Sequence, residues 1–260
     1  MALKIGKVEK YMVETIEKDG VAFFGLIDPS IPIEKSMEHV KAFHEGGADI
    51  ILIGGSLGIV ENSLNDLVDR IKEASDLPVM LYPGNINGIA AKADALYFMS
   101  LMNSSNPYWI TGAQALAAPS IAKLDIDIIP TSLLIIEPGE TVGWVGEARA
   151  IPYHKPDIAV AFALAGKFLG HRVTILERGS GAPGPANPEM FRLVREAVRH
   201  PVICAGSCRT LADIEQTILA GADGIHVASI IQQASNPFRK AKDVIGFAKE
   251  AGKKKMKSGK

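Results

Sequence analysis

The sequence predicts a single α/β domain folded as a TIM-type (βα)8 barrel. Eight short runs are almost continuously apolar, as is typical of parallel strands buried on both faces, and helical patterns separate them. Eight such repeats favour a closed barrel over an open doubly wound sheet. The 260 residues suit one barrel and no linker divides them, so we expect the barrel over 1–252 and a flexible lysine-rich tail over 253–260.

Strands and helices are assigned from these runs and from the residues that end them. In chain order, the expected strands are Val21–Ile27, Ile50–Ile53, Val79–Tyr82, Ala95–Met99, Thr131–Ile136, Val173–Leu176, Val202–Ala205 and Gly224–Val227. Five helices have recognisable start or stop signals. They are Glu34–Glu45 before Gly46-Gly47, Asn62–Ala74 before Asp76-Leu77-Pro78, Pro188–Arg199 with Asn187 as N-cap, Thr210–Ala220 before Gly221, and Pro237–Ala251.

Two connections interrupt the regular alternation. The link PGNINGIAAKAD over 83–94 is too short and too rich in glycine for a full crossover helix. We therefore expect a short irregular link where a regular barrel has its third helix. The segment PGETVGWVGEARAIPYHKP over 138–156 predicts a long loop, of a length that is usual for lids and interfaces.

Composition and charge exclude several classes of protein. Five of the 28 basic residues lie in the tail, so the remaining body carries 23 basic and 29 acidic residues and is no general nucleic-acid binder. Two cysteines, Cys204 and Cys208, are too few for a disulfide scaffold. The N-terminus lacks an apolar signal region, and no apolar run approaches the length of a membrane span. We expect a soluble, cytoplasmic protein whose lysine tail makes at most peripheral membrane contact.

The residues that follow the strands point to a functional rim, because barrel chemistry gathers at the C-terminal strand ends. They are almost all glycines, small hydroxyl residues, asparagines and carboxylates. They include Asp28-Pro29, Gly54-Gly55-Ser56, Pro83-Gly84-Asn85, Ser100, Glu137-Pro138-Gly139, Glu177-Arg178-Gly179-Ser180-Gly181, Gly206-Ser207 and Ala228-Ser229.

Three of these ends predict a phosphate site. Gly179-Ser180-Gly181, Gly206-Ser207 and Ala228-Ser229 follow the sixth, seventh and eighth strands, where barrels commonly hold phosphate. Glycine lets backbone N–H groups approach phosphate oxygens closely. The alternative is that these glycines only turn the chain after each strand.

Two carboxylates are the candidate catalytic groups. Asp28 follows an all-apolar strand, where it is a metal ligand, an acid or base, or a helix cap. With the hydroxyl of Ser56 and water it would suit Mg²⁺, which also takes substrate phosphate oxygens. Glu177 lies next to the phosphate ends, where it would accept a hydrogen bond or a proton from a substrate hydroxyl. The alternative for Glu177 is an ion pair with Arg178 or Arg209.

Other catalytic motifs are missing from the sequence. The six histidines are scattered over predicted helices, strands and loops, and form neither a metal cluster with carboxylates nor a Ser/His pair. No GxGxxG motif opens a helix after the first strand, and no Walker motif is present. These absences disfavour hydrolase and dinucleotide-binding functions.

The strand-end motifs together resemble the geranylgeranylglyceryl phosphate synthase family over nearly the whole chain. The matching segments are IDPS (27–30), GGS (54–56), YPGN (82–85), LMNSSNPYWITGAQ (101–114), LERGSGAP (176–183), GSCRT (206–210) and HVAS (226–229). The resemblance implies Mg²⁺-dependent transfer of the prenyl group of geranylgeranyl diphosphate to the 3-hydroxyl of sn-glycerol 1-phosphate. This reaction makes the first ether bond of archaeal membrane phospholipids. The family barrel also lacks a normal third helix.

The resemblance also implies roles for individual residues. Asp28 and Ser56 match the magnesium positions. The glycerol phosphate contacts match Ile175, Leu176, Glu177, Arg178, Gly179, Ser180, Gly181, Gly206, Ser207, Ala228 and Ser229. Many members have Tyr in place of Ile175, so one hydroxyl contact differs in this chain. Members often have Gly-Gly in place of Gly206-Ser207 and Gly-Asn or Gly-Thr in place of Ala228-Ser229, and the backbone donors remain despite these changes. The family's oligomers imply a homo-oligomer here, with Trp144 as an interface anchor or a lid contact.

An apolar groove for the prenyl tail is expected around the fourth strand. Asn103, Tyr108 and Trp109 are its candidate residues, with Tyr97, Phe98, Met99, Met102 and Ile110 as further material or as ordinary core. The paired DDxxD motif of other prenyltransferases is absent, so a single metal-binding carboxylate would have to serve.

Two other functions stay open from the sequence. One is a sugar-phosphate isomerase or aldolase, which would need a catalytic lysine or an acid/base pair inside the barrel, and no expected strand carries an interior lysine. The other is a non-catalytic barrel that only binds a phosphorylated ligand.

Overall fold

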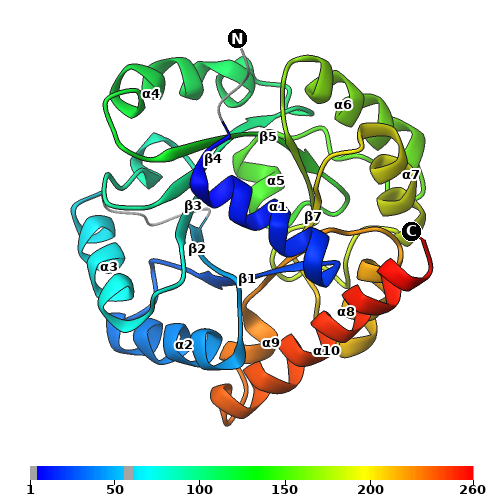
Figure 1. Cartoon of the computed structure of the whole chain (residues 1–260). Helices are drawn as coiled ribbons and strands as arrows, with labels where there is room; N and C mark the ends of the chain where they lie inside the picture. Colours follow the sequence, from blue (N-terminus) through cyan, green and yellow to red (C-terminus); the bar gives the residue numbers. More distant parts are fainter. Residues whose placement is uncertain (1–4, 56–60, 260) are drawn as a thin grey trace.

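The computed structural model describes residues 5–55 and 61–259, and its strands form a closed, eight-stranded parallel barrel (Figure 1). The strands follow one another around the barrel in chain order, and β8 closes on β1 with Gly224 opposite Ala22. They are β1 (Ala22–Ile27), β2 (Ile50–Gly55), β3 (Val79–Pro83), β4 (Ala95–Leu101), β5 (Asp127–Ile135), β6 (Val173–Glu177), β7 (Val202–Ala205) and β8 (Gly224–Val227). The predicted TIM-type barrel is confirmed.

Helices surround the strands and one of them caps the barrel. They are α1 (Lys7–Asp19), α2 (Ile33–Gly46), α3 (Glu61–Ala74), α4 (Ala113–Ile121), α5 (Glu140–Val145), α6 (Pro156–Phe168), α7 (Pro188–Val198), α8 (Leu211–Leu219), α9 (Ser229–Gln232) and α10 (Pro237–Lys257). All five predicted helices are present. The helices α1, α4, α5, α6 and α9 had no predicted counterpart. The pattern of α6 is nearly all apolar, so it shows no polar face from which a helical period could be recognised.

Two apolar layers hold this arrangement together. Alternate strand residues point into the barrel, where Phe24, Leu52, Met80 and Ile203 form one buried cluster. The intervening residues pack outward against the helices in a second, larger cluster. This alternation is the period-2 geometry of strands, and burial on both faces explains why the strand sequences are continuously apolar.

The helix α1 closes the N-terminal end of the barrel. Figure 1 shows it lying across the centre of the ring of strands, and Val8 and Met12 are buried in the interior cluster. The N–H of Val8 donates to Asp127 Oδ2 at the start of β5. This end is covered by α1, whereas a cavity opens at the C-terminal strand ends.

The two irregular connections are largely as predicted. The link between β3 and β4 holds only the 3₁₀ turn η1 (Ile86–Gly88), which confirms the prediction that no full crossover helix follows the third strand. The long segment 138–156 is a loop except for the short helix α5. The largest difference in a strand boundary is at β5, which begins at Asp127, not Thr131, and so includes Pro130; the other strand ends differ by at most two residues. Pro130 has no N–H to donate, but its carbonyl accepts a hydrogen bond from Arg172 N at 2.8 Å, so it remains part of the sheet.

The expected flexible tail is wrong for most of its length. The helix α10 continues through Lys257, and Lys255 is buried, with its Nζ 2.8 Å from Ala222 O and 3.1 Å from Asp223 Oδ1. A run of lysines suggests a solvated end, but one face of the helix turns Lys255 onto the chain just before β8. Lys260 lies outside the described residues.

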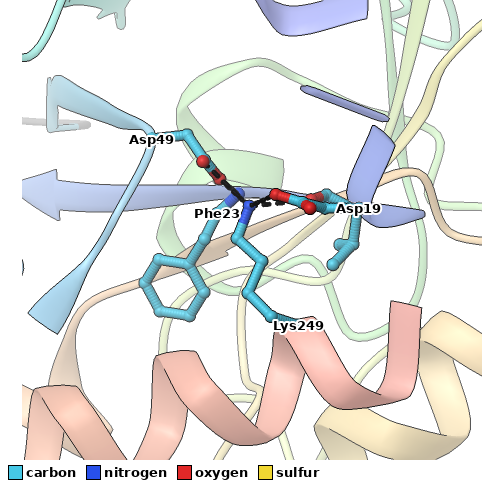
Figure 2. A network of polar contacts seen from close by, with 5 residues as sticks. Asp19, Phe23, Asp49 and Lys249 are labelled. Atoms are coloured by element: carbon cyan, nitrogen blue, oxygen red, sulfur yellow. Dashed lines mark hydrogen bonds and ion pairs between the residues drawn. The ribbon is translucent and has the colours of Figure 1, made fainter. Parts of the chain in front are cut away.

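A second lysine ties α10 to the N-terminal end of the barrel (Figure 2). Lys249 Nζ lies 2.6 Å from Asp49 Oδ2 and 3.1 Å from Asp19 Oδ2, and the N–H of Phe23 also donates to Asp49 at 2.6 Å. Burial raises the pKa of Asp49, and the charge of Lys249 opposes that shift. The network joins three chain segments on the side of the barrel away from the predicted site.

A helix that crosses a bilayer needs about 20 mostly apolar residues. Within 5–55 and 61–259, no helix is long and apolar enough to do so.

Candidate active site

A cavity of about 870 Å³ opens at the C-terminal ends of the strands. The ends of all eight strands or the loops that follow them contribute to its lining, as does α4. One side carries the polar groups predicted from the strand ends, and the other is a wall of apolar side chains. The cavity therefore joins the predicted phosphate site and an apolar groove in one space.

Asp28 lines this cavity just beyond β1. Its Oδ1 accepts a hydrogen bond from Ser30 N at 2.8 Å, and Gly55 leaves room for the carboxylate, because a Cβ there would lie 3.1 Å from Oδ1. Within the described part of the chain, no group of three or more His, Cys, Asp or Glu residues could hold a metal ion. A lone carboxylate at a cavity rim fits Mg²⁺ held largely by water and phosphate oxygens, and no tightly caged metal. Ser56 lies outside the described residues.

Glu177 is buried at the end of β6 and faces the same cavity. Gly179 N donates to its Oε1 at 2.6 Å, and the hydroxyl of Tyr82 donates to its Oε2 at 3.1 Å. Burial raises the pKa of Glu177, while these two hydrogen bonds lower it. Among the contacts of the described residues, no ion pair joins Glu177 to Arg178 or Arg209, so the alternative drawn from the sequence is wrong.

The predicted phosphate ends meet beside Glu177. Gly179, Gly181 and Gly206 have positive φ angles of 89°, 102° and 74°, which explains glycine at these turns. Ser207 Oγ donates to Gly179 O at 2.9 Å and so links the ends of β6 and β7. The residues that line the cavity here are Ser180, Gly181, Gly206, Ser207, Ala228 and Ser229.

Gly206 has a second reason to lack a side chain. A Cβ at this position would lie 2.3 Å from Glu177 Oε1 and 2.9 Å from Gly179 N. The bare Cα therefore gives the carboxylate the space in which it meets Gly179.

Four residues expected to contact glycerol phosphate lie outside the cavity lining: Ile175, Leu176, Arg178 and Gly179. Ile175 is buried inside the barrel and Leu176 in the outer layer, because successive strand residues point to opposite faces. Arg178 donates from Nε to Glu137 O at 2.7 Å and from Nη1 to Gly184 O at 2.7 Å. Its guanidinium supports the loops around the site and does not face the cavity. Of residues 175–181, only Glu177, Ser180 and Gly181 line the cavity, and the N–H of Gly179 is used by Glu177 Oε1.

The expected prenyl groove is supported for Trp109, which lines the apolar wall with Phe98 and Met99. Tyr108 lies behind this wall and donates to Asn85 Oδ1 at 2.7 Å. Asn103 is buried and bonds the backbone of Ile135 and Arg149, so it is a structural residue and the groove assignment is wrong for it. The sequence reasoning missed the contributions of α4 and α5, which are Ala113, Ala117, Ile121, Val142 and Val145.

The floor of the cavity holds two residues with no predicted role, Tyr82 and His226. Tyr97 Oη lies 3.3 Å from His226 Nε2, and the three rings pack edge-on or tilted. Burial lowers the pKa of His226 to about 3, so the imidazole is neutral. The motif YPGN contained Tyr82, but nothing in the sequence indicated that its side chain reaches Glu177.

A sequence model of the PcrB family matches residues 14–245. The chain belongs to the PcrB family. A relative from Thermococcus kodakarensis, named geranylgeranylglyceryl phosphate synthase, is 48% identical over 235 residues, which cover 90% of this chain and 93% of the relative. The resemblance found in the strand-end motifs is confirmed.

Solved structures agree with membership of the PcrB family. The (S)-3-O-geranylgeranylglyceryl phosphate synthase of Thermoplasma acidophilum, in complex with its substrate sn-glycerol-1-phosphate, is 32% identical with a TM-score of 0.89, and the match covers 95% of this chain and all of that one. The wild-type GGGPS of Thermoplasma volcanium is 34% identical with a TM-score of 0.87, over 92% and 97% of the two chains.

Proposed function

We propose that this PcrB-family chain transfers the geranylgeranyl group of geranylgeranyl diphosphate to the 3-hydroxyl of sn-glycerol 1-phosphate. One observation carries the proposal: a single cavity combines a buried carboxylate, glycine-rich strand ends suited to phosphate, and an apolar wall. The substrates would be a small phosphorylated polyol and a long apolar chain. The names of the PcrB relatives and the substrate bound in the Thermoplasma acidophilum structure support the same reaction.

The polar side of the cavity would bind and orient the acceptor. Backbone groups at Ser180, Gly206 and Ser229 would hold its phosphate and place a hydroxyl near Glu177. The oxygen of that hydroxyl forms a bond to the allylic carbon, the carbon–oxygen bond to diphosphate breaks, and its electron pair leaves with diphosphate. Glu177 accepts the hydroxyl proton. Fixing the acceptor in this way converts capture of the prenyl group into a step within one complex.

Magnesium dependence is part of the proposal. Asp28 would hold the ion, together with Ser56, water and substrate oxygens. A bound Mg²⁺ would neutralise charge on the departing diphosphate. The side chains and backbone of the protein would do the rest, and the apolar wall of the cavity would exclude water from the reacting carbon.

The first test measures transfer from labelled geranylgeranyl diphosphate with and without Mg²⁺. We expect product with sn-glycerol 1-phosphate, far less with the 3-phosphate enantiomer, and little from Asp28→Asn. If neither enantiomer nor a shorter prenyl donor gives product, the prenyltransferase assignment fails. An Asp28→Asn chain that keeps both ligand affinity and function would favour a non-catalytic binding barrel. An aldolase is disfavoured because no lysine lines the cavity in the described part of the chain.

We also propose a cytoplasmic homo-oligomer. Trp144, Phe168 and Leu169 are 84%, 80% and 72% exposed, which is costly for large apolar side chains in a monomer. Light scattering should give a mass above one chain, and Trp144→Ala should lower it if this residue anchors the interface. An unchanged mass would leave Trp144 as a lid contact.

Any contact with a membrane would involve the cavity end of the barrel. The lysine-rich end of α10 is tied through Lys249 and Lys255 to the chain before β2 and β8, which is the opposite end from the cavity. The lysines therefore could not face the same bilayer as the cavity entrance. Removing 258–260 should leave binding to anionic vesicles unchanged.

A further inference from the structure

Tyr82 reaches across the barrel to the proposed catalytic carboxylate. It lies near the end of β3, and Glu177 ends β6, so three strand-to-strand steps separate them around the barrel. The hydroxyl of Tyr82 nevertheless lies 3.1 Å from Glu177 Oε2. Its ring is held by Tyr97 and His226, whose ring centroids are 5.9 and 5.2 Å away in edge-on contacts. The hydroxyl is thus aimed by packing from two other strands.

The two oxygens of Glu177 have different surroundings. Oε1 accepts the N–H of Gly179 at 2.6 Å and lies where a Cβ on residue 206 would touch it. Oε2 accepts the hydroxyl of Tyr82, and both side chains line the cavity. A carboxylate oxygen has two lone pairs, so Oε2 can accept one further hydrogen bond. The bond from Gly179 to Oε1 is buried, whereas the bond from Tyr82 to Oε2 is only partly buried, so Oε2 is the more accessible oxygen for a substrate hydroxyl.

We propose that Tyr82 is a positioning residue for the transfer reaction, whose hydroxyl orients Glu177 Oε2 toward the acceptor hydroxyl. This inference rests on the proposed function. The hydroxyl proton of Tyr82 is donated to Glu177, so we assign its effect on the reaction to that carboxylate. It complements Gly179, which holds the other oxygen, so the carboxylate is fixed from both sides of the barrel.

The groups around Glu177 determine in which direction its pKa should change when the hydroxyl of Tyr82 is removed. The titratable groups that face the pair are Tyr97 on β4 and His226 on β8, whereas Cys204 on β7 points into the outer layer. Asp28 and Arg209 line the same cavity, and the guanidinium of Arg209 donates to Gly181 O at 2.8 Å. Arg178 turns its guanidinium away toward Glu137 O. His226 is neutral and the guanidinium of Arg209 is used by Gly181 O, so neither replaces the lost donor. The hydrogen bond from Tyr82 lowers the pKa of Glu177, so removing it should raise that pKa further.

The test is Tyr82→Phe, which keeps the ring and removes only the hydroxyl. The ionised form of Glu177 is the active one, so activity is lost as the pH falls through its pKa. We expect the acidic limb of kcat/KM to move up by about one pH unit, which is roughly a tenfold loss on that limb. Tyr97→Phe is the matched control: it removes another hydroxyl from the same cluster that does not contact Glu177, and its limb should stay in place.

A double-mutant cycle on acceptor binding separates positioning from simple packing. Calorimetry with sn-glycerol 1-phosphate should show about five- to tenfold weaker binding for Tyr82→Phe, and less than about twofold further effect in the Glu177→Gln background. Thermal denaturation checks that both chains are folded. Equal losses in the two backgrounds, or an unmoved acidic limb, would overturn the role of Tyr82. A wild-type chain that forms no product would instead refute the proposed function.

Discussion

Gly206→Ala tests whether the phosphate end of β7 and the carboxylate of Glu177 are built as one unit. Gly206 has φ of +74°, and an alanine in a left-handed conformation costs about 1–2 kcal/mol. The new Cβ would also lie 2.3 Å from Glu177 Oε1. The carboxylate must then move and give up its 2.6 Å bond from Gly179 N, and hydrogen bonds to charged groups contribute about 1.5–3 kcal/mol. Together these effects correspond to a stability loss of about 2.5–5 kcal/mol.

The expected effect on activity is larger than the loss of stability alone would cause. A displacement of about 1 Å in a catalytic group can cost about a hundredfold in rate. We therefore expect about a hundredfold lower kcat/KM in the prenyl transfer assay, at a temperature where urea denaturation shows the variant to be folded.

Gly170→Ala is the matched control. Gly170 has φ of +97°, and a Cβ there would have nothing within 4 Å, so this variant pays only the backbone cost. It should lose about 1–2 kcal/mol of stability and keep wild-type transfer. If Gly206→Ala retained wild-type activity, or if both variants lost the same stability, the steric coupling between Gly206 and Glu177 would be refuted.

Three further predictions concern charged and titratable groups. Lys249→Met should lower the free energy of unfolding by about 2–4 kcal/mol, because it leaves Asp49 buried without its cation. Lys254→Met, which breaks an exposed ion pair, should change the free energy of unfolding little. Equal effects of the two variants in urea denaturation would contradict this reasoning. Below pH 6.5, His226 is protonated in the unfolded chain but neutral in the folded one, so the stability of the protein should fall toward pH 4. The fall should be steeper in the wild-type chain than in His226→Phe. Equal slopes of stability against pH in the two chains would rule out this contribution. Arg178→Met should lower stability but leave the salt dependence of glycerol phosphate binding unchanged. A weaker salt dependence in this variant would show that the charge of Arg178 acts on the bound phosphate.

The sequence alone predicted the barrel because its signals are local. Strand residues buried on both faces are continuously apolar, and glycines mark the turns that need positive φ, so the eight strands and the glycine-rich ends of β6 and β7 could be predicted from the sequence. Asp28 and Glu177 were found because a carboxylate directly after an apolar strand stands out. Helices α1 and α6 were missed because one begins before any strand and the other has no polar face.

The direction of individual side chains was decided only by the tertiary structure. Asn103 and Arg178 belong to polar motifs, but both donate to backbone carbonyls. Asn103 donates to the carbonyl of Arg149, which is distant in sequence, and Arg178 donates to that of Gly184 in the adjoining loop. Lys255 belongs to a lysine run, but the packing of α10 buries it against Asp223.

What the sequence determined about this protein is its architecture and the location of its site, since apolar periodicity and glycine placement act over a few residues. What only the folded chain decided is which groups meet inside the site. Tyr82 and Glu177 are 95 positions apart, and their contact depends on the register and closure of the barrel. No local pattern specifies that contact, because it arises when eight strands turn their alternate side chains into one shared interior.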